Sequence, residues 1–269
     1  MVEIFDNIRK IYKFSAPCDE LANYIDFFSE SCKDSTLRLI PAEKFIVKMF
    51  QSWTPTFWFN LGTPYRIESN NRSHFIKQED DVLILRNTTV TRHVSSGDHI
   101  FSIKFFPGGL EAILGIGQAK LLDKILPLKS IVPRAIIENI KKANSYEERV
   151  NLLQRYFLIN VIKQHKRDYY IKFVRDTMDA YQEENLLFNT SEVAEKMFIT
   201  SKTINRYFNT VVGVSPKRYF SIIRARTALT QYVADAQQFD PGHFGYYDMS
   251  HFCKEVFNFT GQKLGKLAH

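Results

Sequence analysis

The hydrophobic pattern changes once along the chain, from short alternating runs in the first hundred residues to a helical periodicity afterwards. Short apolar or alternating runs separated by turn residues predict strands between about residues 35 and 106. These runs are 36–40, 57–59, 81–85 and 99–106. Their spacing favours a barrel or a sandwich over βαβ units. Before them, the pattern predicts a short helix over residues 19–28.

The second pattern begins where Pro107, Gly108 and Gly109 end the last strand and residues 110–116 start a helix. After about residue 130 the chain is helical almost throughout. Ser145-x-x-Glu148 is a capping box, and it predicts a helix that buries one face. That face contains Val150, Leu153 and Phe157. We therefore expect an α+β protein.

A polar, charged stretch at residues 163–168 indicates a domain boundary. We expect a β-rich regulatory domain over residues 1–130, a helical linker over 131–167 and an all-helical domain over 168–269. The helices of residues 135–162 are the candidate face for a homodimer, because they combine apolar stripes with a position at the domain junction.

Composition narrows the class of protein. A chain of 269 residues, 45% apolar and 24% charged, can bury one or two cores and is neither collagen-like nor disordered. The three cysteines, Cys18, Cys32 and Cys253, lie too far apart for a disulfide framework or a zinc pattern. Without an 18-residue apolar run or a signal-peptide pattern, the sequence predicts a cytoplasmic protein without a membrane partner.

The net charge of +7 is unevenly distributed. Residues 1–167 carry +6, whereas residues 168–269 carry +1, with a local +4 from residue 185 onward. Bulk charge therefore does not by itself indicate nucleic-acid binding by the C-terminal third. The surplus in the N-terminal half is compatible with an acidic partner or ligand.

The C-terminal third contains a helix-turn-helix pattern. Asn189 is suited to cap a short helix that ends near Met197, and Thr200 to cap a second helix over residues 201–211. The second helix would bury Ile204, Phe208 and Val211. Its opposite face carries Lys202, Asn205, Arg206 and Asn209. Lysine, arginine and asparagine can contact base edges or phosphates, so this is either a DNA-reading helix or an ordinary amphipathic helix with a solvated face.

A longer helix and a second cluster follow. Gly213 ends the preceding helix, and Ser215-Pro216 starts one that extends to about residue 232, roughly 25 Å long. Asp248 can then cap a further helix that buries Phe252, Val256 and Phe259. Ser250, His251 and Lys254 lie on another face of this helix. Two such helices around a rigid spacer suit successive major grooves, about 34 Å apart.

Residues 188–261 resemble the double helix-turn-helix domain of AraC/XylS-type transcriptional regulators. The matching positions form five blocks whose spacing also agrees. They are Ala194; Thr200, Ile204, Arg206 and Phe208; Gly213 to Pro216; Arg224 and Ala228; and Gly245, Tyr246, Asp248, Ser250 and Phe252. The run 104–115 also resembles the end of the β-rich domain that precedes such units in bacterial regulators.

This resemblance implies a sequence-specific DNA-binding transcriptional regulator, not an enzyme, controlled by its N-terminal domain. It implies that Lys202, Asn205 and Arg206 contact bases in the first unit, and Met249, Ser250, His251 and Lys254 in the second. Arg224 matches a packing or salt-bridge position. The partners expected are double-stranded promoter DNA and, as further candidates, RNA polymerase, a small-molecule effector and a second copy of the chain.

Three departures from the family pattern are visible. Phe198 stands where the first turn usually has glycine. Residues 236–244 are about two residues short, and Asp240-Pro241-Gly242-His243 replaces a helical core, so the first helix of the second unit should be short or distorted. The proline that often follows Gly261 is missing.

Motifs for other chemistry are missing. The sequence has no glycine-rich phosphate loop, no GxSxG and no HExxH, and we expect no cofactor and no metal. His74, His93 and His99 could serve a metal-binding barrel, although no ligand spacing supports it. Trp53, Phe57, Trp58 and Phe59 either line a ligand pocket or belong to the core. A small-molecule binder or a cupin-like enzyme with a degenerate DNA-binding domain is therefore the alternative function.

Overall fold

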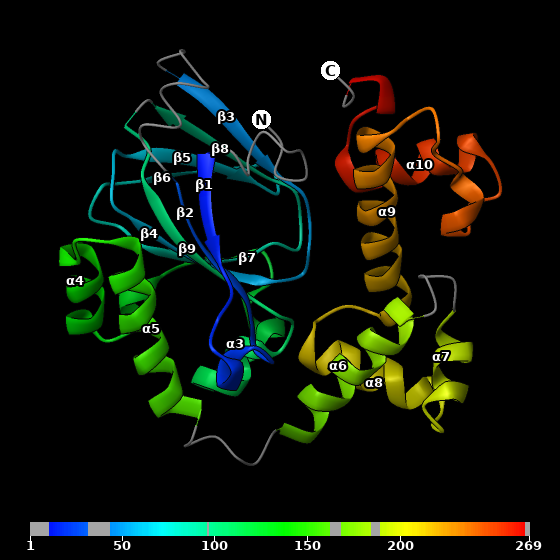
Figure 1. Cartoon of the computed structure of the whole chain (residues 1–269), viewed down its shortest axis with the longest axis horizontal. Helices are drawn as coiled ribbons and strands as arrows, with labels where there is room; N and C mark the ends of the chain where they lie inside the picture. Colours follow the sequence, from blue (N-terminus) through cyan, green and yellow to red (C-terminus); the bar gives the residue numbers. More distant parts are fainter. Residues whose placement is uncertain (1–10, 32–43, 96, 162–167, 184–188, 267–269) are drawn as a thin grey trace.

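The computed structural model describes residues 11–31, 44–95, 97–161, 168–183 and 189–266. Within these ranges an N-terminal β-sandwich of two antiparallel sheets is followed by helices, and the α+β prediction is confirmed (Figure 1). None of the helices in these ranges is long and apolar enough to cross a lipid bilayer.

The larger sheet has six antiparallel strands in the order β1-β2-β9-β4-β7-β10. Its strands are β1 (Tyr12–Ser15), β2 (Ile25–Ser31), β9 (Ile100–Phe105), β4 (Pro55–Asn60), β7 (Val82–Leu85) and β10 (Ile125–Pro127). The strands predicted at 57–59, 81–85 and 99–106 are confirmed as β4, β7 and β9. The run 36–40 lies outside the described residues.

The smaller sheet has four antiparallel strands in the order β3-β8-β5-β6. They are β3 (Lys44–Met49), β8 (Val90–Ser95), β5 (Tyr65–Ser69) and β6 (Arg72–Ile76). An apolar cluster that includes Val47, Trp58, Ile67, Ile84 and Val90 fills the space between the sheets. The sandwich alternative of the sequence prediction is therefore the observed one.

The helix predicted over residues 19–28 is wrong. Only the short 3-10 helix η1 (Asp19–Leu21) forms there, and Ile25–Ser31 is strand β2, paired with both β1 and β9. A register irregularity between Ile25 and Phe27 interrupts the strand's alternation, so Ile25 and Phe28 join the same core. The resulting spacing of Leu21, Ile25 and Phe28 imitates a helical stripe.

Helices α3 (Gly109–Leu114), α4 (Arg134–Lys142) and α5 (Tyr146–Val161) pack on the larger sheet. The capping box before α5 is formed in part, because the Ser145 Oγ accepts from the Glu148 amide at 3.1 Å. The Glu148 carboxylate accepts from the Asn144 amide at 2.8 Å instead. Val150, Leu153 and Phe157 are buried as predicted.

The C-terminal part consists of helices α6 (Asp168–Glu183), α7 (Thr190–Lys196), α8 (Ser201–Val211), α9 (Pro216–Ala234) and α10 (Met249–Thr260). The short 3-10 helices η4 (Pro241–Phe244) and η5 (Leu264–Lys266) complete it. Helix α9 extends between the α6–α8 group and α10 (Figure 1).

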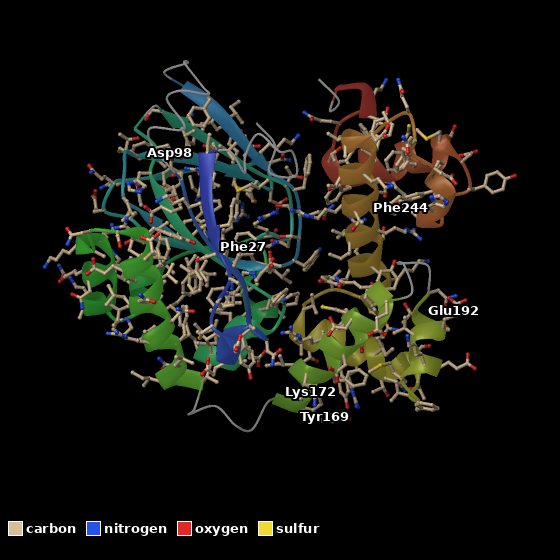
Figure 2. All side chains as sticks on the ribbon, in the orientation of Figure 1. Phe27, Asp98, Tyr169, Lys172, Glu192 and Phe244 are labelled. Atoms are coloured by element: carbon tan, nitrogen blue, oxygen red, sulfur yellow. The ribbon has the colours of Figure 1, made fainter. Side chains whose placement is uncertain are left out.

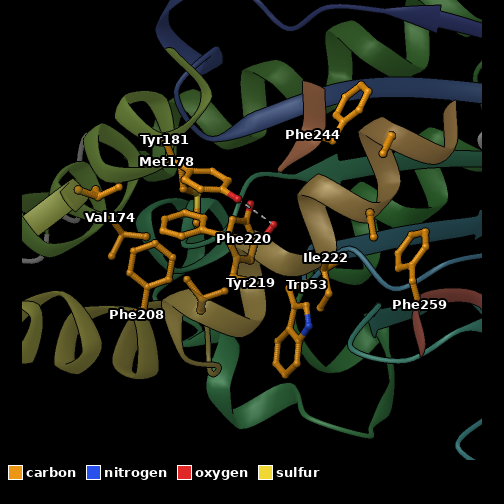
Figure 3. Close-up of a cluster of buried hydrophobic side chains, with 14 of the residues drawn as sticks. Trp53, Val174, Met178, Tyr181, Phe208, Tyr219, Phe220, Ile222, Phe244 and Phe259 are labelled. Carbon is orange, nitrogen blue, oxygen red and sulfur yellow. Dashed lines mark hydrogen bonds between the residues drawn. The ribbon is translucent and has the colours of Figure 1, made fainter. Parts of the chain in front are cut away.

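The helical part shares its core with the β-sandwich. Phe50, Trp53 and Ala112 belong to the same buried apolar cluster as the helices, and Figure 3 shows Trp53 and Phe259 within it. The fully buried Gln118 donates from Nε2 to the carbonyl oxygens of Trp53, at 2.7 Å, and Val212, at 2.9 Å. Since Gln118 precedes β10 and Val212 follows α8, this side chain joins the two parts directly.

Candidate nucleic-acid interface

The first helix-turn-helix unit, residues 189–211, has the predicted boundaries. The Asn189 side chain accepts from the amides of Ser191, at 2.8 Å, and Glu192, at 3.2 Å, while Glu192 accepts from the Asn189 amide at 2.6 Å. This reciprocal capping box starts α7 without help from distant residues. Val193 and Ala194 are buried as predicted.

The turn between α7 and α8 has one unusual residue. Phe198 adopts a left-handed conformation, with φ of +55°, and its side chain is 96% exposed. The family pattern has glycine at this position, and glycine adopts a positive φ at no steric cost. Phe198 therefore keeps the backbone geometry of the turn and places an aromatic ring in solvent beside the start of α8.

Helix α8 separates an apolar face from a polar one. Thr200 caps it by accepting from the Thr203 amide at 3.2 Å, and Ile204, Phe208 and Val211 are buried. Lys202, Arg206 and Asn209 are exposed, and Asn205 is half-buried beside them. The four polar side chains singled out in the sequence therefore occupy one outward face.

Two of these side chains are engaged with the helix itself. Asn205 donates from Nδ2 to the Ser201 carbonyl at 2.8 Å, and Asn209 donates to the Asn205 carbonyl at 2.7 Å. Bidentate recognition of adenine needs both the amide donor and the amide acceptor of an asparagine. Asn205 must therefore leave its bond to Ser201 before it can read a base in that way.

Arg206 is positioned by an aromatic cluster that sequence reasoning missed. Its guanidinium lies 5.0 Å from the centre of the Tyr207 ring. Tyr207 packs in turn against Tyr170 and Phe173 of α6, with ring centres 4.7 Å and 5.0 Å apart. Figure 2 shows Tyr169, the neighbour of Tyr170, at the beginning of α6. The sequence signal for this cluster was the pair of consecutive tyrosines, Tyr169 and Tyr170, at the start of α6.

Helix α9 begins as predicted, because Ser215 caps it and Pro216 is its first residue. It extends two residues beyond the predicted end, to Ala234. The Arg224 guanidinium lies 5.0 Å from the centre of the Tyr246 ring. Arg224 thus packs α9 against the segment that precedes α10.

The second helix-turn-helix unit, residues 240–260, begins with the 3-10 helix η4 in place of a regular first helix. This confirms the expected distortion, which Pro241 and Gly242 explain. Three phenylalanine rings pack between η4 and α10. The ring centre of Phe239 lies 4.6 Å from that of Phe252 and 5.7 Å from that of Phe244. The truncated unit therefore still has a packed core.

Helix α10 has the same division of faces as α8. Asp248 accepts from the His251 amide at 2.7 Å, and Phe252, Val256 and Phe259 are buried. All four side chains that the sequence assigned to base contact are exposed on this helix. They are Met249, Ser250, His251 and Lys254.

A cavity of about 150 Å³ lies between the two sheets and reaches helix α9. Its apolar walls include Val47, Met49, Trp58 and Ile100. Its charged side chains are Arg86, Arg92, Lys104 and Arg226, the last of which belongs to α9. Among the described residues that line it, none is acidic.

Arg92 and Lys104 have carboxylate partners. Arg92 donates to Asp98 and, at 2.8 Å, to the Tyr12 hydroxyl, while the Lys104 ammonium lies 3.0 Å from Asp26. Arg86 donates to the Phe50 carbonyl at 2.7 Å. The cavity thus combines apolar walls with cationic side chains, of which Arg92 and Lys104 are paired with carboxylates outside the lining.

The histidines and aromatic residues that the sequence offered for a metal site or a ligand pocket do not come together in one site. His93 contacts Glu68 at 3.1 Å, and His99 contacts Glu30 at 2.9 Å. Within the described ranges, no group of three histidine, cysteine or acidic side chains is placed to hold a metal ion. Phe57 and Phe59 are fully buried in the core, whereas Trp58 lines the cavity.

No protein-family model and no curated protein sequence matches the chain. The solved structures that it resembles include two of ToxT from Vibrio cholerae, with TM-scores of 0.46 and 0.47 and identities of 12% and 10%. Each covers 84% of this chain, with 97% and 96% of the ToxT chain aligned. A further ToxT structure, with a bound unsaturated fatty acid, has a TM-score of 0.44 and an identity of 10%.

The structure of the AraC-like transcriptional activator CuxR also matches, at 10% identity and a TM-score of 0.22. That match covers 94% of this chain and 82% of the CuxR chain. The solved structures to which the chain is similar thus include those of ToxT and of the AraC-like activator CuxR, all at 10–12% identity.

Proposed function

We propose that this protein is a sequence-specific DNA-binding transcriptional regulator of the AraC/XylS type, in which α8 and α10 enter successive major grooves. The single observation that carries the proposal is the repeated arrangement of the two units. Each has a side-chain-capped helix that buries its apolar stripe and turns a polar face outward. Helix α9 holds the two units at its opposite ends (Figure 1).

The dimensions of α9 support this arrangement. Its 19 residues span about 28 Å at 1.5 Å per residue. Neighbouring half-sites on one face of B-DNA are about 34 Å apart. Because the helices at the two ends have their own width, the spacer is suited to place α8 and α10 one turn of DNA apart.

We assign base and phosphate contacts to the exposed side chains of the two helices. In the first unit, Lys202 and Arg206 suit guanine acceptors or phosphates, and Asn205 suits adenine once it leaves Ser201. In the second unit, Ser250, His251 and Lys254 supply the polar contacts and Met249 an apolar one. The phosphate share of these contacts would make the affinity dependent on salt.

Selection of bound sequences from a random DNA library, with the full chain, tests the proposal. Two conserved blocks about 10 base pairs apart are expected if both units bind, and one block if a single unit binds. The triple variant Lys202→Ala, Asn205→Ala, Arg206→Ala should lose the first block, and Lys254→Ala should weaken the second. Lys172→Ala, an exposed change on α6, is the control. Specific binding that survives the triple change would contradict the assignment.

The division into residues 1–130, 131–167 and 168–269 completes the proposal, with residues 135–162 as the candidate dimer face. The N-terminal domain would control the units through an effector in the cavity between the sheets. Positive charge around apolar walls suits a carboxylate on an apolar body, the chemical class to which the fatty acid bound by ToxT belongs. A volume near 150 Å³ has room for a body about the size of benzene.

Since Arg226 belongs to α9, an occupant of the cavity would touch the helix that carries both units. Benzoate is the probe for this part of the proposal. It should raise the melting temperature of the unaltered chain, and the variant Arg226→Gln should show a smaller rise than Lys217→Gln, an exposed control on the same helix. Equal shifts in the two variants would remove Arg226 from the effector site.

A further inference from the structure

A second, larger hollow lies between the smaller sheet and the helical part. Its volume is about 770 Å³, within the range of small-molecule sites. The β5–β6 hairpin and residues 88–91 form one wall, and the first turn of α9 and the last turn of α10 form the other. It is separate from the cavity between the sheets, since the two share no lining residue.

The hairpin at this cleft has a fixed geometry. Ser69 pairs with Arg72, so Asn70 and Asn71 form a two-residue loop, and both have a positive φ, +50° and +57°. This is the pattern of a type I′ turn, which asparagine tolerates better than most residues. The turn fixes where Arg72 leaves the sheet, at the edge of the cleft.

Three cationic side chains line the cleft: Lys48 from β3, Arg72 from β6 and Arg218 from α9. None of them has a carboxylate partner among the described residues. The acidic side chain in the lining, Glu68, lies 3.1 Å from His93. Partial burial lowers the pKa of Lys48, as expected for an ammonium group that loses water without gaining a counter-ion. The cleft therefore has an excess of positive charge that a bound anion would neutralise.

The rest of the lining consists mainly of hydroxyl and amide groups. The hydroxyls belong to Ser69, Ser73, Thr88, Thr89, Thr91 and Thr260. Among the described lining residues, Phe259 supplies the one aromatic ring, and this ring is only 3% exposed. The cleft thus offers many hydrogen bonds and no exposed ring on which a nucleobase could stack.

We propose that this cleft binds a small phosphorylated, hydroxyl-rich molecule of the sugar-phosphate class, with Arg72, Arg218 and Lys48 around the phosphate. Arginine suits phosphate because its planar guanidinium can donate two parallel hydrogen bonds. The hydroxyls of Ser73, Thr89 and Thr91 and the amides of Asn70, Asn71 and Asn258 would hydrogen-bond to the hydroxyls of the ligand, whereas the buried Thr260 hydroxyl is already bonded to Val256 and Gln262.

The position of the cleft gives such a ligand a regulatory consequence, and this part rests on the proposed function. One wall belongs to the β-sandwich and the other to the helices that flank the second unit. Among the described residues, the direct hydrogen bond across this junction is a long one, from Gln51 Nε2 to the Phe259 carbonyl at 3.4 Å. A ligand that contacts both walls would hold α10 against the sandwich and change the spacing of the two units.

Calorimetric titration of the full chain with glucose 6-phosphate, without DNA, tests the site. We expect saturable binding, with no heat from glucose and weaker binding of inorganic phosphate. The variants Arg72→Gln and Arg218→Gln should each weaken binding at least tenfold. Both arginines are exposed, so the fold should tolerate the changes. Arg66→Gln is the matched control, because Arg66 is exposed on β5 but does not line the cleft.

Three results would overturn the proposal: no binding of glucose 6-phosphate at millimolar concentration, equal affinity in the Arg66 and Arg72 variants, or tighter binding of adenosine monophosphate than of glucose 6-phosphate. A chain that binds glucose 6-phosphate but no DNA sequence would support the cleft and contradict the proposed function. Specific DNA binding without any glucose 6-phosphate binding would support the proposed function and contradict the proposal for the cleft.

Discussion

The two helix-turn-helix units have similar helices but different attachments to the β-sandwich. The first is joined by close packing and buried hydrogen bonds. A Cβ on Gly108 would lie 2.7 Å from Val211, and Gln118 bonds to the Val212 carbonyl. The second unit contacts the sandwich through Phe259, whose ring centre lies 5.1 Å from that of Phe50 and whose carbonyl accepts from Gln51 at 3.4 Å.

Under the proposed function, this difference gives the N-terminal part a means of acting on DNA binding. The end of α8 is joined to the sandwich by the 2.9 Å bond from Gln118 to the Val212 carbonyl, whereas among the described residues the bond from the sandwich to α10 is the longer one from Gln51 to the Phe259 carbonyl, at 3.4 Å. Ser221 of α9 donates to Glu255 of α10 at 2.9 Å, so the second unit is tied first to the spacer helix. The first unit would then set the position on DNA, and the second would be the adjustable one.

The largest difference between the two units is expected from a pair of core truncations, Phe208→Ala in the first unit and Phe252→Ala in the second. Each removes a fully buried ring and should cost about 3–5 kcal/mol of stability. Phe208→Ala should expose amides in the sandwich as well as in α8, because the end of α8 contacts the sandwich through Gly108 and Gln118. Phe252→Ala should increase exchange in η4 and α10 alone. Hydrogen exchange measured by mass spectrometry distinguishes these patterns.

Identical exchange patterns in the two variants would mean that the second unit is as firmly joined to the sandwich as the first. Leu229→Ala, in the buried face of α9 between the units, is the control. It should affect both units, because both pack on α9.

A smaller loss of stability is expected when the buried Gln118 is replaced. Gln118→Ala leaves the carbonyl oxygens of Trp53 and Val212 and the Gly108 amide without this partner. Since each buried polar group left unpaired costs about 1–3 kcal/mol, the loss should reach about 3 kcal/mol. Gln51→Ala, which removes only the 3.4 Å bond to Phe259, should cost less than about 1 kcal/mol. Urea unfolding gives both values, and equal losses would contradict the asymmetry.

The helix-turn-helix units could be predicted from sequence because their signals are local. Asn189, Thr200, Ser215 and Asp248 all accept amide hydrogens from residues two or three positions ahead, so each cap is contained in a short segment. The distortion of η4 was predictable for the same reason, since Pro241 and Gly242 stand where the family pattern has a helix interior, which both residues disfavour.

The parts that were missed depend on pairing between distant segments. Strand β2 was taken for a helix because its neighbours β1 and β9, and not its own pattern, decide its conformation. The cavity between the sheets joins Val47 to Arg226, and the cleft joins Arg72 to Arg218. No short-range pattern could place these residues together. The aromatic support of Arg206 likewise combines α6 with α8.

The smallest difference expected between the two units is in how their stability depends on pH in the alkaline range. Burial raises the pKa of Tyr181, on α6 in the core on which the first unit packs, to about 12, and that of Tyr246, in the second unit, also to about 12. Because the unfolded chain loses these protons near pH 10, both tyrosines contribute stability that is complete below pH 10 and decreases toward pH 12. Tyr246→Phe should reduce the loss of stability of α10 between pH 10 and pH 12. Tyr181→Phe should do the same for the first unit.

Absorbance of tyrosinate near 295 nm, followed together with hydrogen exchange, measures which unit opens. With Tyr246→Phe, the alkaline opening of α10 should move to higher pH, while that of α8 stays unchanged. Since Tyr181 stacks on Phe220 at 3.9 Å between ring centres, within the core attached to the sandwich, its titration should require opening of the whole first unit. If both units opened at one pH in every variant, the two would be a single cooperative body, and α10 could not be adjusted independently of α8.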